Sequence, residues 1–205
     1  MPSKPKRMFF GKHVFLVDEN VYEPAEDSFL FAENIEVKVG ERVLDIGTGC
    51  GLLAILAAEK ASEVVAVDIN PYAVRCANQN AKLSACSKIA FIRGDLFTAL
   101  REQRRFDLIL FNAPYLPKDE NEPDSWLTCA WSGGTRGRET IDHFIAQSAT
   151  HLEPKGRILL LQSSISGIAE TFRTFEANGF RTEIIAECSA PFFETIVLFK
   201  AKLRV

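Results

Sequence analysis

A short segment, Asn112-Ala113-Pro114-Tyr115, directly follows the mostly apolar run Phe106–Phe111. A side-chain amide followed by a proline-restricted corner and an aromatic ring can hold a planar NH2 group by its hydrogens and by its face. The segment therefore predicts an enzyme that acts on an amide or amino nitrogen. Its predicted catalytic residues are Asn112, Ala113, Pro114 and Tyr115.

A glycine-rich loop earlier in the chain, residues 45–51 (DIGTGCG), follows a predicted strand and precedes a predicted helix. Its spacing is G-x-G-x-G, whereas dinucleotide sites have G-x-G-x-x-G. The Asp45 carboxylate would repel a pyrophosphate but attract a ligand that carries an ammonium and a sulfonium. We therefore predict S-adenosylmethionine as the cofactor; a dinucleotide site and a purely structural turn are the alternatives. The predicted contacts in this loop are Asp45, Gly47, Thr48, Gly49 and Gly51.

Two further acidic residues follow later strands of the predicted sheet. Asp68 can accept both hydroxyls of a ribose, as the acid after a Rossmann loop does, or it can cap the next helix. Asp95 can accept from an adenine amino group, or it can stabilise a turn. Ligands of open α/β sheets bind at the carboxyl ends of the strands, where all these acids are expected. The predicted cofactor contacts therefore also include Asp68, Ile69, Asp95, Leu96 and Asn112.

The elements that position these residues alternate between strand and helix from residue 39 onward. Continuous apolar strands separated by helices predict an α/β domain with a mostly parallel sheet and helices on both faces. Only a few residues separate the last two strands, so these should pair antiparallel. The predicted strands are Arg42–Ile46, Glu63–Asp68, Lys88–Arg93, Phe106–Phe111, Arg157–Gln162, Arg181–Glu187 and Thr195–Lys200. The predicted helices are Leu52–Lys60, Pro71–Leu83, Arg138–His151 and Ile165–Asn178, with Asn70 as an N-cap and Gly179 as a helix stop.

The composition indicates one globular domain over residues 1–205, with 47% hydrophobic and 25% charged residues. A net charge of -3 gives no reason to expect a nucleic-acid partner. Five scattered cysteines and three histidines predict neither a metal site nor disulfides, and thus a cytoplasmic protein. We expect no membrane span and no signal peptide.

Two regions outside this core carry their own signals. The N-terminal arm, residues 1–36, contains Tyr22-Glu23-Pro24-Ala25-Glu26-Asp27-Ser28 before an apolar stretch, which predicts a helix start with proline in the first turn. Residues 115–138 lack helical or strand periodicity and hold four acidic residues and both tryptophans. Because long irregular loops in compact domains are usually functional or disordered, we predict a substrate-facing loop there.

Several motifs in one order resemble a known family. They are the 22–29 segment, the glycine loop, Asp68-Ile69-Asn70-Pro71, Asn112-Ala113-Pro114-Tyr115, and Ala130-Trp131-Ser132-Gly133-Gly134 with Gly137-Arg138-Glu139. Together they resemble the class I, Rossmann-like methyltransferases, and within these the HemK branch of glutamine N5-methyltransferases in its short archaeal and eukaryotic form. The resemblance implies a seven-stranded, mostly parallel sheet whose last strand is antiparallel.

The resemblance also implies a reaction and its partners. Methyl would pass from S-adenosylmethionine to the glutamine of the GGQ motif in a peptide-chain release factor, a step that belongs to translation termination. A small zinc-binding activator subunit is a possible partner, and an exposed apolar sheet edge at Val64–Val67 or Lys88–Ile92 would support it. The implied cofactor contacts are Tyr22, Pro24, Asp27 and Ser28, and the implied substrate contacts are Tyr115, Trp131, Gly133, Gly134 and Arg138.

One residue departs from the family pattern. The usual tetrapeptide is N-P-P-Y, and this chain has Ala113 in place of the first proline. In the expected geometry residue 113 offers its carbonyl, and Ala113 keeps that carbonyl ahead of Pro114, so we expect activity to be retained. Asn112 and the Ala113 carbonyl would each accept one hydrogen of the substrate NH2, while Tyr115 would pack over its plane. No general base is required before attack.

Three other functions fit some of these residues. An adenine-N6 methyltransferase on DNA or RNA acts on an amino group with the same two hydrogens, but it must flip the base and grip the backbone. A methyltransferase of another protein substrate would use the same clamp. A non-enzymatic methyl-donor-binding protein would bind the cofactor and be insensitive to changes at Asn112.

Overall fold

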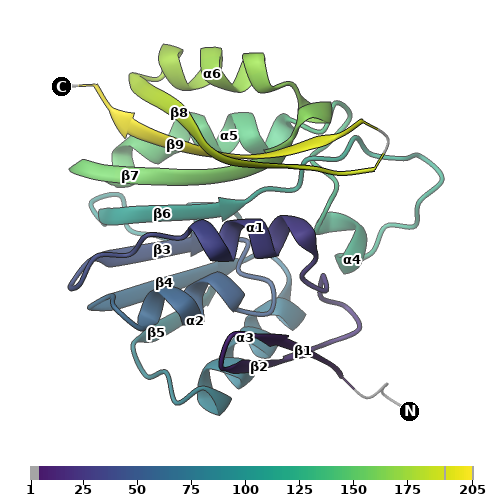
Figure 1. Ribbon diagram of the computed structural model, residues 1–205, viewed down its shortest axis with the longest axis vertical. Coiled ribbons are helices and arrows are strands. Elements are labelled where there is room, and N and C mark those ends of the chain that lie inside the picture. Colours follow the sequence, from purple (N-terminus) through teal and green to yellow (C-terminus); the bar gives the residue numbers. More distant parts are fainter. Residues whose placement is uncertain (1–4, 192, 205) are drawn as a thin grey trace.

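A seven-stranded sheet forms the centre of the computed structural model, which describes residues 5–191 and 193–204 (Figure 1). The first four residues of the predicted arm therefore lie outside the described residues. The strand order is β5-β4-β3-β6-β7-β9-β8. The strands are β3 (Arg42–Ile46), β4 (Glu63–Asp68), β5 (Ile89–Arg93), β6 (Phe106–Asn112), β7 (Leu152–Ser163), β8 (Phe180–Ser189) and β9 (Thr195–Leu203).

The pairing of the strands confirms the predicted mostly parallel sheet. Strands β3 to β7 pair parallel with one another, and β9 runs antiparallel to both β7 and β8. The order reverses between β3 and β6, which is where open α/β sheets bind their ligands.

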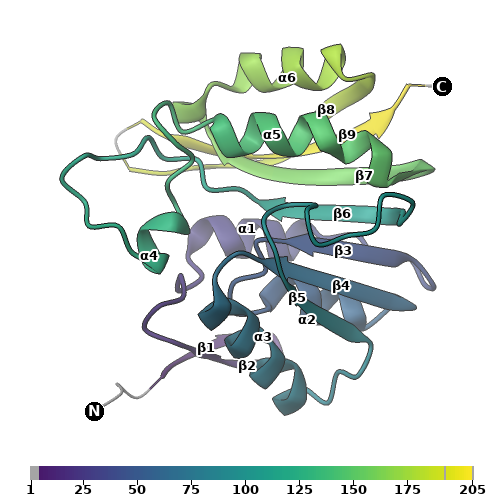
Figure 2. The same cartoon turned by 180° about the vertical axis from the view of Figure 1, so that it is seen from behind.

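Helices cover both faces of the sheet. Figure 1 shows α1 (Glu26–Asn34) and α2 (Leu52–Ala58) in front of it, and Figure 2 shows α5 (Glu139–Ser148) in front when seen from behind. One buried apolar cluster joins α1, α2 and α3 (Pro71–Leu83) to the sheet, and a second joins α5 and α6 (Ile168–Ala177) to it. The two clusters explain why the central strands are apolar on both faces.

Helix boundaries follow local signals in some places and depart from them in others. Asn70 caps α3 by accepting from the Tyr72 N–H at 2.9 Å, and Gly179 stands at φ 82 after α6, as predicted. The helix predicted over Ile165–Asn178 is instead a 3-10 turn, η2 (Ser164–Ser166), and then α6, because Gly167 turns the chain at φ 80. Helix α5 likewise ends before a short 3-10 turn, η1 (Ala149–His151).

Three features of the arm and loop differ from the sequence-based expectation. Strands β1 (Lys6–Phe10) and β2 (His13–Val17) form an antiparallel hairpin that the pattern did not predict. Helix α1 begins at Glu26, so Pro24 precedes it and does not stand in its first turn. The segment 115–138 contains a short helix, α4 (Trp126–Cys129), because Ser125 accepts from the Thr128 N–H and starts it.

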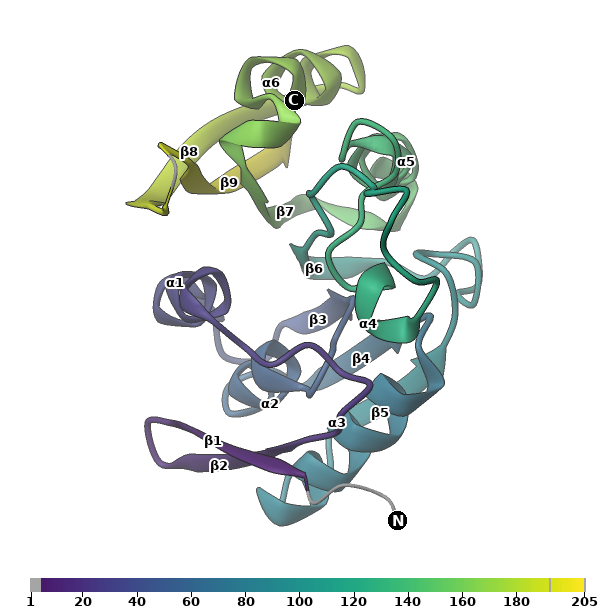
Figure 3. The same cartoon turned by 90° about the vertical axis from the view of Figure 1, so that its right-hand side faces the viewer.

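The predicted site residues gather at the carboxyl edge of the sheet. Figure 3, which faces this edge, shows the segment before α1 and the loop with α4 on opposite sides of the ends of β3 and β4. The fold thus brings the arm, the glycine loop and the 115–138 segment to one place, although they are far apart in the sequence.

Candidate active site

One cavity of about 580 Å³ opens at this edge, within the size range of small-molecule sites. All but four of the predicted site residues line it. Those that do are Tyr22, Pro24, Asp27, Ser28, Gly47, Thr48, Gly49, Asp68, Ile69, Asp95, Leu96, Asn112, Ala113, Pro114, Tyr115, Trp131 and Gly134. The residues that do not are Asp45, Gly51, Gly133 and Arg138.

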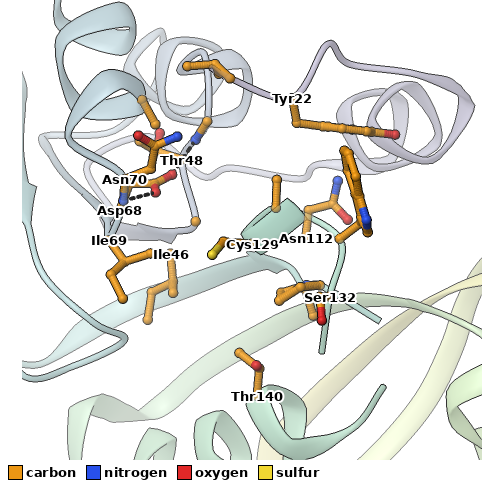
Figure 4. Close-up of a pocket in the computed structure, with 18 of the residues that line it drawn as sticks. Tyr22, Ile46, Thr48, Asp68, Ile69, Asn70, Asn112, Cys129, Ser132 and Thr140 are labelled. Carbon is orange, nitrogen blue, oxygen red and sulfur yellow. Dashed lines mark hydrogen bonds between the residues drawn. The ribbon is translucent and has the colours of Figure 1, made fainter. Parts of the chain in front are cut away.

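Asp68 defines one end of the cavity, with Ile69 and Ile46 beside it (Figure 4). Its two oxygens accept from the Gly49 and Asn70 backbone N–H groups, each at 2.9 Å, so the strand end and the glycine loop are held together. Burial raises the pKa of Asp68, while these two hydrogen bonds oppose the shift. Each carboxylate oxygen still has a free lone pair, so Asp68 is able to accept from a ligand hydroxyl.

The turn after β5 completes this end of the cavity. The Asp95 N–H donates to Thr98 Oγ1 at 3.1 Å, and the Thr98 hydroxyl donates back to the Asp95 carbonyl at 2.7 Å. Leu96 lies at φ 47, in the left-handed region that a side chain of this size rarely adopts. Both Asp95 and Leu96 line the cavity, so this fixed turn forms part of its wall.

Asp45 is placed differently from the expectation. It is 1% exposed and lies beneath the loop, where Oδ2 accepts from the Thr48 hydroxyl at 2.6 Å and Oδ1 has no partner within the described chain. Burial raises its pKa to about 7, an effect that the Thr48 hydrogen bond opposes and the Asp68 charge reinforces. Asp45 is thus not on the cavity surface, and Thr48 lies between its carboxyl group and the cavity.

The raised pKa of Asp45 makes stability depend on pH in one direction. Since the folded state holds this proton more tightly than the unfolded chain, the stabilisation is complete below the ordinary value of 3.8 and is lost as the pH rises through about 7. We expect the free energy of unfolding of the native protein, relative to Asp45→Asn, to fall between about pH 4 and pH 7 and then level off. Urea titrations of both proteins at several pH values measure this difference, and parallel curves would contradict it.

Asn112 marks the other end of the cavity, near Tyr22 (Figure 4). Its Nδ2 donates to Asp27 Oδ2 at 3.1 Å and to Ser28 Oγ at 3.2 Å. Its Oδ1 is buried and has no partner in the described part of the chain. Because an unpaired buried acceptor costs free energy, this oxygen is suited to accept a hydrogen from a ligand.

Two tyrosines enclose the same end of the cavity. Tyr22 donates to Asp27 Oδ1 at 3.1 Å, and Tyr115 follows the proline corner. Burial is the first cause that raises the pKa of both phenols, and the Asp27 charge adds to it. Both side chains are therefore neutral at physiological pH and offer an aromatic face and a hydroxyl without charge.

A short backbone ladder ties residues 116–118, which follow the Asn112–Tyr115 segment, to the Trp131–Gly134 turn. Leu116 N–H donates to the Trp131 carbonyl at 2.8 Å, Gly133 N–H donates to the Leu116 carbonyl at 2.9 Å, and Lys118 N–H donates to the Gly134 carbonyl at 2.8 Å. A Cβ on Gly133 would lie 2.4 Å from the Pro114 carbonyl oxygen. Gly133 thus positions Pro114 by close packing, although it does not line the cavity.

Two further predicted roles do not agree with the structure. Arg138 is 2% exposed and donates to the Gly167 carbonyl at 3.0 Å and to Asp142 Oδ1 at 2.7 Å, so it joins α5 to α6 and does not reach a substrate. Gly51 packs α2 against α3, since a Cβ there would lie 3.0 Å from the Ala77 Cβ. Both residues serve the fold beside the site.

Several cavity residues were not predicted. Helix α4 and its flanks form the largest group, and they lie in the segment 115–138 that was predicted to face the substrate without its individual contacts. The others lie on the ends of neighbouring strands, in the connecting loops, or on α2, α3 and α5. The principal additions are Val21, Ile46, Asn70, Ser125, Trp126, Thr128, Cys129, Ser132 and Thr140.

No metal-binding group of three or more His, Cys, Asp or Glu side chains occurs among the described residues. Within the same part of the chain, no helix has the length and apolar character needed to cross a membrane.

Comparison with known proteins places this arrangement in a family. The model of the methyltransferase small domain matches residues 21–128. A Methanocaldococcus jannaschii protein, provisionally named a protein N5-glutamine methyltransferase, is 46% identical over 180 residues, which are 87% of this chain and 90% of that protein. Methyltransferase HEMK2 of Mus musculus is 30% identical over 195 residues, or 88% of each chain.

A solved structure agrees with the family model and with these two relatives. The E. cuniculi Mtq2–Trm112 complex, described as responsible for methylation of the eRF1 translation termination factor, has a chain that superposes with a TM-score of 0.67 and 26% identity. The match covers 90% of this chain and 99% of that chain. The chain therefore belongs to the methyltransferase small domain family and, within it, to the HemK-like protein N5-glutamine methyltransferases.

Proposed function

We propose that the protein transfers a methyl group from S-adenosylmethionine to the side-chain nitrogen of the glutamine in the GGQ motif of a peptide-chain release factor. The observation that carries this proposal is a pair of acceptors without donors at one end of the cavity. Asn112 Oδ1 is buried and unpaired, and the neighbouring Ala113 carbonyl receives no hydrogen bond within the described residues. A primary amide has two hydrogens to fill them.

The two acceptors suit the chemistry of an amide nitrogen. Such a nitrogen is a poor nucleophile because its lone pair is delocalised into the carbonyl group. Acceptors on both hydrogens orient the NH2 group and keep electron density on nitrogen, which is catalysis by positioning and preorganised electrostatics. Methylation makes the nitrogen very acidic, so its proton passes to water afterward and no side chain is needed as a base.

The residues at the other end of the cavity fit the proposed cofactor. When bound, S-adenosylmethionine supplies an electrophilic methyl group on a sulfonium. Asp68 has lone pairs free for ribose hydroxyls, and the Asp95–Leu96 turn presents polar groups for an adenine. The backbone of Gly47 and Gly49 lines the cavity between these residues and Asn112, where a methionine moiety would lie.

The segment 115–138 is proposed to face the protein substrate. Its helix α4 and Trp131 line the cavity, and Trp131 Nε1 donates to Glu122 Oε2 at 3.1 Å, which holds the acidic part of the loop against the site. Because release factors act on ribosomes, the proposed reaction takes place in the cytoplasm. We propose that residues 1–205 work as a single domain in it.

A small activator subunit is proposed to bind at the free edge of the sheet. Strand β4 lies between β3 and β5, so the predicted edge at Val64–Val67 does not exist, whereas β5 is an edge strand with half-buried Ile89, Phe91 and Ile92. The solved relative is a complex with Trm112, which supports a partner of this kind. A zinc-binding partner on β5 is the form that we propose.

The adenine-N6 alternative uses the same pair of acceptors and must be tested beside the amide. The net charge of -3 disfavours a grip on a nucleic-acid backbone, and the relatives named above are protein methyltransferases or their homologues. The decisive experiment therefore includes a parallel reaction with a nucleic-acid substrate.

That experiment is mass spectrometry of a matching release factor after incubation with this protein and S-adenosylmethionine, with and without the activator. We expect the GGQ peptide to gain the mass of one methylene group, and fragmentation to place it on the glutamine. A release factor with this glutamine replaced by alanine is the control and should stay unmodified. Methylation of adenine in added DNA or RNA, with the glutamine untouched, would overturn the proposal.

A further inference from the structure

Asp27 accepts three hydrogen bonds at the end of the cavity where Asn112 lies. It stands in the first turn of α1 and is only 7% exposed. Its Oδ1 accepts from the Tyr22 hydroxyl at 3.1 Å and from the Ser28 hydroxyl at 3.2 Å, and its Oδ2 accepts from Asn112 Nδ2 at 3.1 Å. All three donors come from residues that line the cavity.

These contacts decide which way the Asn112 carboxamide faces. A carboxamide has nearly the same shape after a half-turn that exchanges its oxygen and its NH2 group, so packing alone does not distinguish the two orientations. A carboxylate only accepts hydrogen bonds. With Nδ2 toward Asp27, Asn112 donates to both Asp27 and Ser28. With Oδ1 toward Asp27, two acceptors would face each other and the bond to Asp27 would be lost.

Ser28 favours the same orientation of the Asn112 carboxamide. Its hydroxyl hydrogen is donated to Asp27, so its oxygen is left as an acceptor for Asn112 Nδ2 at 3.2 Å. Tyr22 donates to the same Asp27 oxygen as Ser28, Oδ1, and helps to hold the carboxylate in place. With Nδ2 held by Asp27 and Ser28, Oδ1 is on the opposite side of the carboxamide and has no partner among the described residues.

We infer that Asp27 is a positioning residue that fixes the orientation of the Asn112 carboxamide, so that its acceptor and not its donor meets the substrate NH2 group. The inference rests on the proposed function for the identity of that substrate. In the reverse orientation Asn112 would present NH2 to NH2, and the substrate nitrogen would lose one of its two acceptors. Helix α1 thus determines the hydrogen-bonding character of a residue 85 positions away.

The test compares Asp27→Leu, which has similar size and no acceptor, with Asp27→Asn, which keeps one oxygen for three donors. We expect kcat to fall roughly 10–100-fold in Asp27→Leu, with Asp27→Asn in between, as for other residues that orient a reacting group. The dissociation constant for S-adenosylmethionine should change by about twofold or less. Glu33→Leu, an acid-to-leucine change at an exposed position of the same helix, is the matched control and should keep native kcat.

A double-mutant cycle separates positioning from a general structural effect. In an Asn112→Ala background there is no carboxamide to orient, so Asp27→Asn should cause no further loss of kcat beyond about twofold. An undiminished loss in that background would overturn the inference. So would a weakened binding of S-adenosylmethionine with native kcat, because Asp27 would then be a cofactor contact only.

A spectroscopic readout keeps this inference distinct from the proposed function. In a 15N-labelled protein, the side-chain NH2 signals of Asn112, identified by their absence in Asn112→Ala, should shift and exchange faster with solvent in Asp27→Asn. Unchanged signals would contradict the orienting contact even if the enzyme methylates glutamine. Changed signals in a protein that fails to methylate the release factor would leave the contact standing and remove the proposed substrate.

Discussion

Replacing Asn112 with alanine is expected to lower kcat by about 10²–10³-fold while S-adenosylmethionine still binds. The side chain supplies one of the two proposed acceptors, and its Oδ1 has no other partner to lose. The proposed cofactor contacts at the Asp68 end of the cavity are not touched by this change. Single-turnover methylation and calorimetric titration with the cofactor measure the two quantities separately.

Asn178→Ala is the matched control for this variant, because Asn178 caps α6 with a bond from Nδ2 to the Thr174 carbonyl and does not line the cavity. It should keep native kcat. Native turnover in Asn112→Ala would remove the central assignment of the site. Loss of cofactor binding in the same variant would show instead that Asn112 serves the donor and not the acceptor nitrogen.

Replacing Gly133 with alanine is expected to damage the site, although Gly133 does not itself line the cavity. A Cβ there would lie 2.4 Å from the Pro114 oxygen and 2.7 Å from the Gly137 oxygen, and backbone atoms have little freedom to move away. Forcing extra atoms into packed positions costs about 1–3 kcal/mol. We expect Gly133→Ala to lower the midpoint of thermal unfolding and to reduce kcat by roughly tenfold or more, because Pro114 and its neighbours must shift.

Gly40→Ala provides the comparison for Gly133→Ala. Gly40 lies in a turn at φ 86 with no atom within 4 Å of an added Cβ, so the change tests backbone strain alone. It should lower the unfolding midpoint and leave kcat near the native value. Equal kcat losses in the two variants would show that the close contact with Pro114 has no part in positioning the site.

The sheet could be predicted from the sequence because its central strands are apolar runs between turn residues, and β8 at the edge alternates between exposed and more buried residues. The hairpin β1–β2 could not, because Gly11, Lys12 and His13 interrupt the apolar residues and hide two strands. In the structure, Gly11 stands at φ 55 in the turn and His13 pairs with Phe10. The polar residues that interrupt the apolar segment therefore mark the turn between the two short strands β1 and β2.

Most of the site residues predicted from motifs with fixed local spacing line the cavity. What spacing could not reveal was the direction of each side chain. Arg138 stands in a motif beside the site but turns toward α6, and Asp45 opens the glycine loop but points beneath it. The bond from Asn112 to Asp27 depends on how α1 packs beside β6, which no local pattern encodes.

The backbone ladder between residues 116–118 and 131–134 has a consequence for how the enzyme cycles. A protein substrate that pulled the loop outward would also pull Tyr115 and Pro114 away from Asn112, because the two strands of the ladder share their hydrogen bonds. If a methylated substrate left by moving the loop outward, Asn112, Pro114 and Tyr115 would separate. They would have to come together again before the next substrate could bind. The ladder therefore favours a rigid opening to the cavity, so that the substrate and not the loop would have to change conformation on binding.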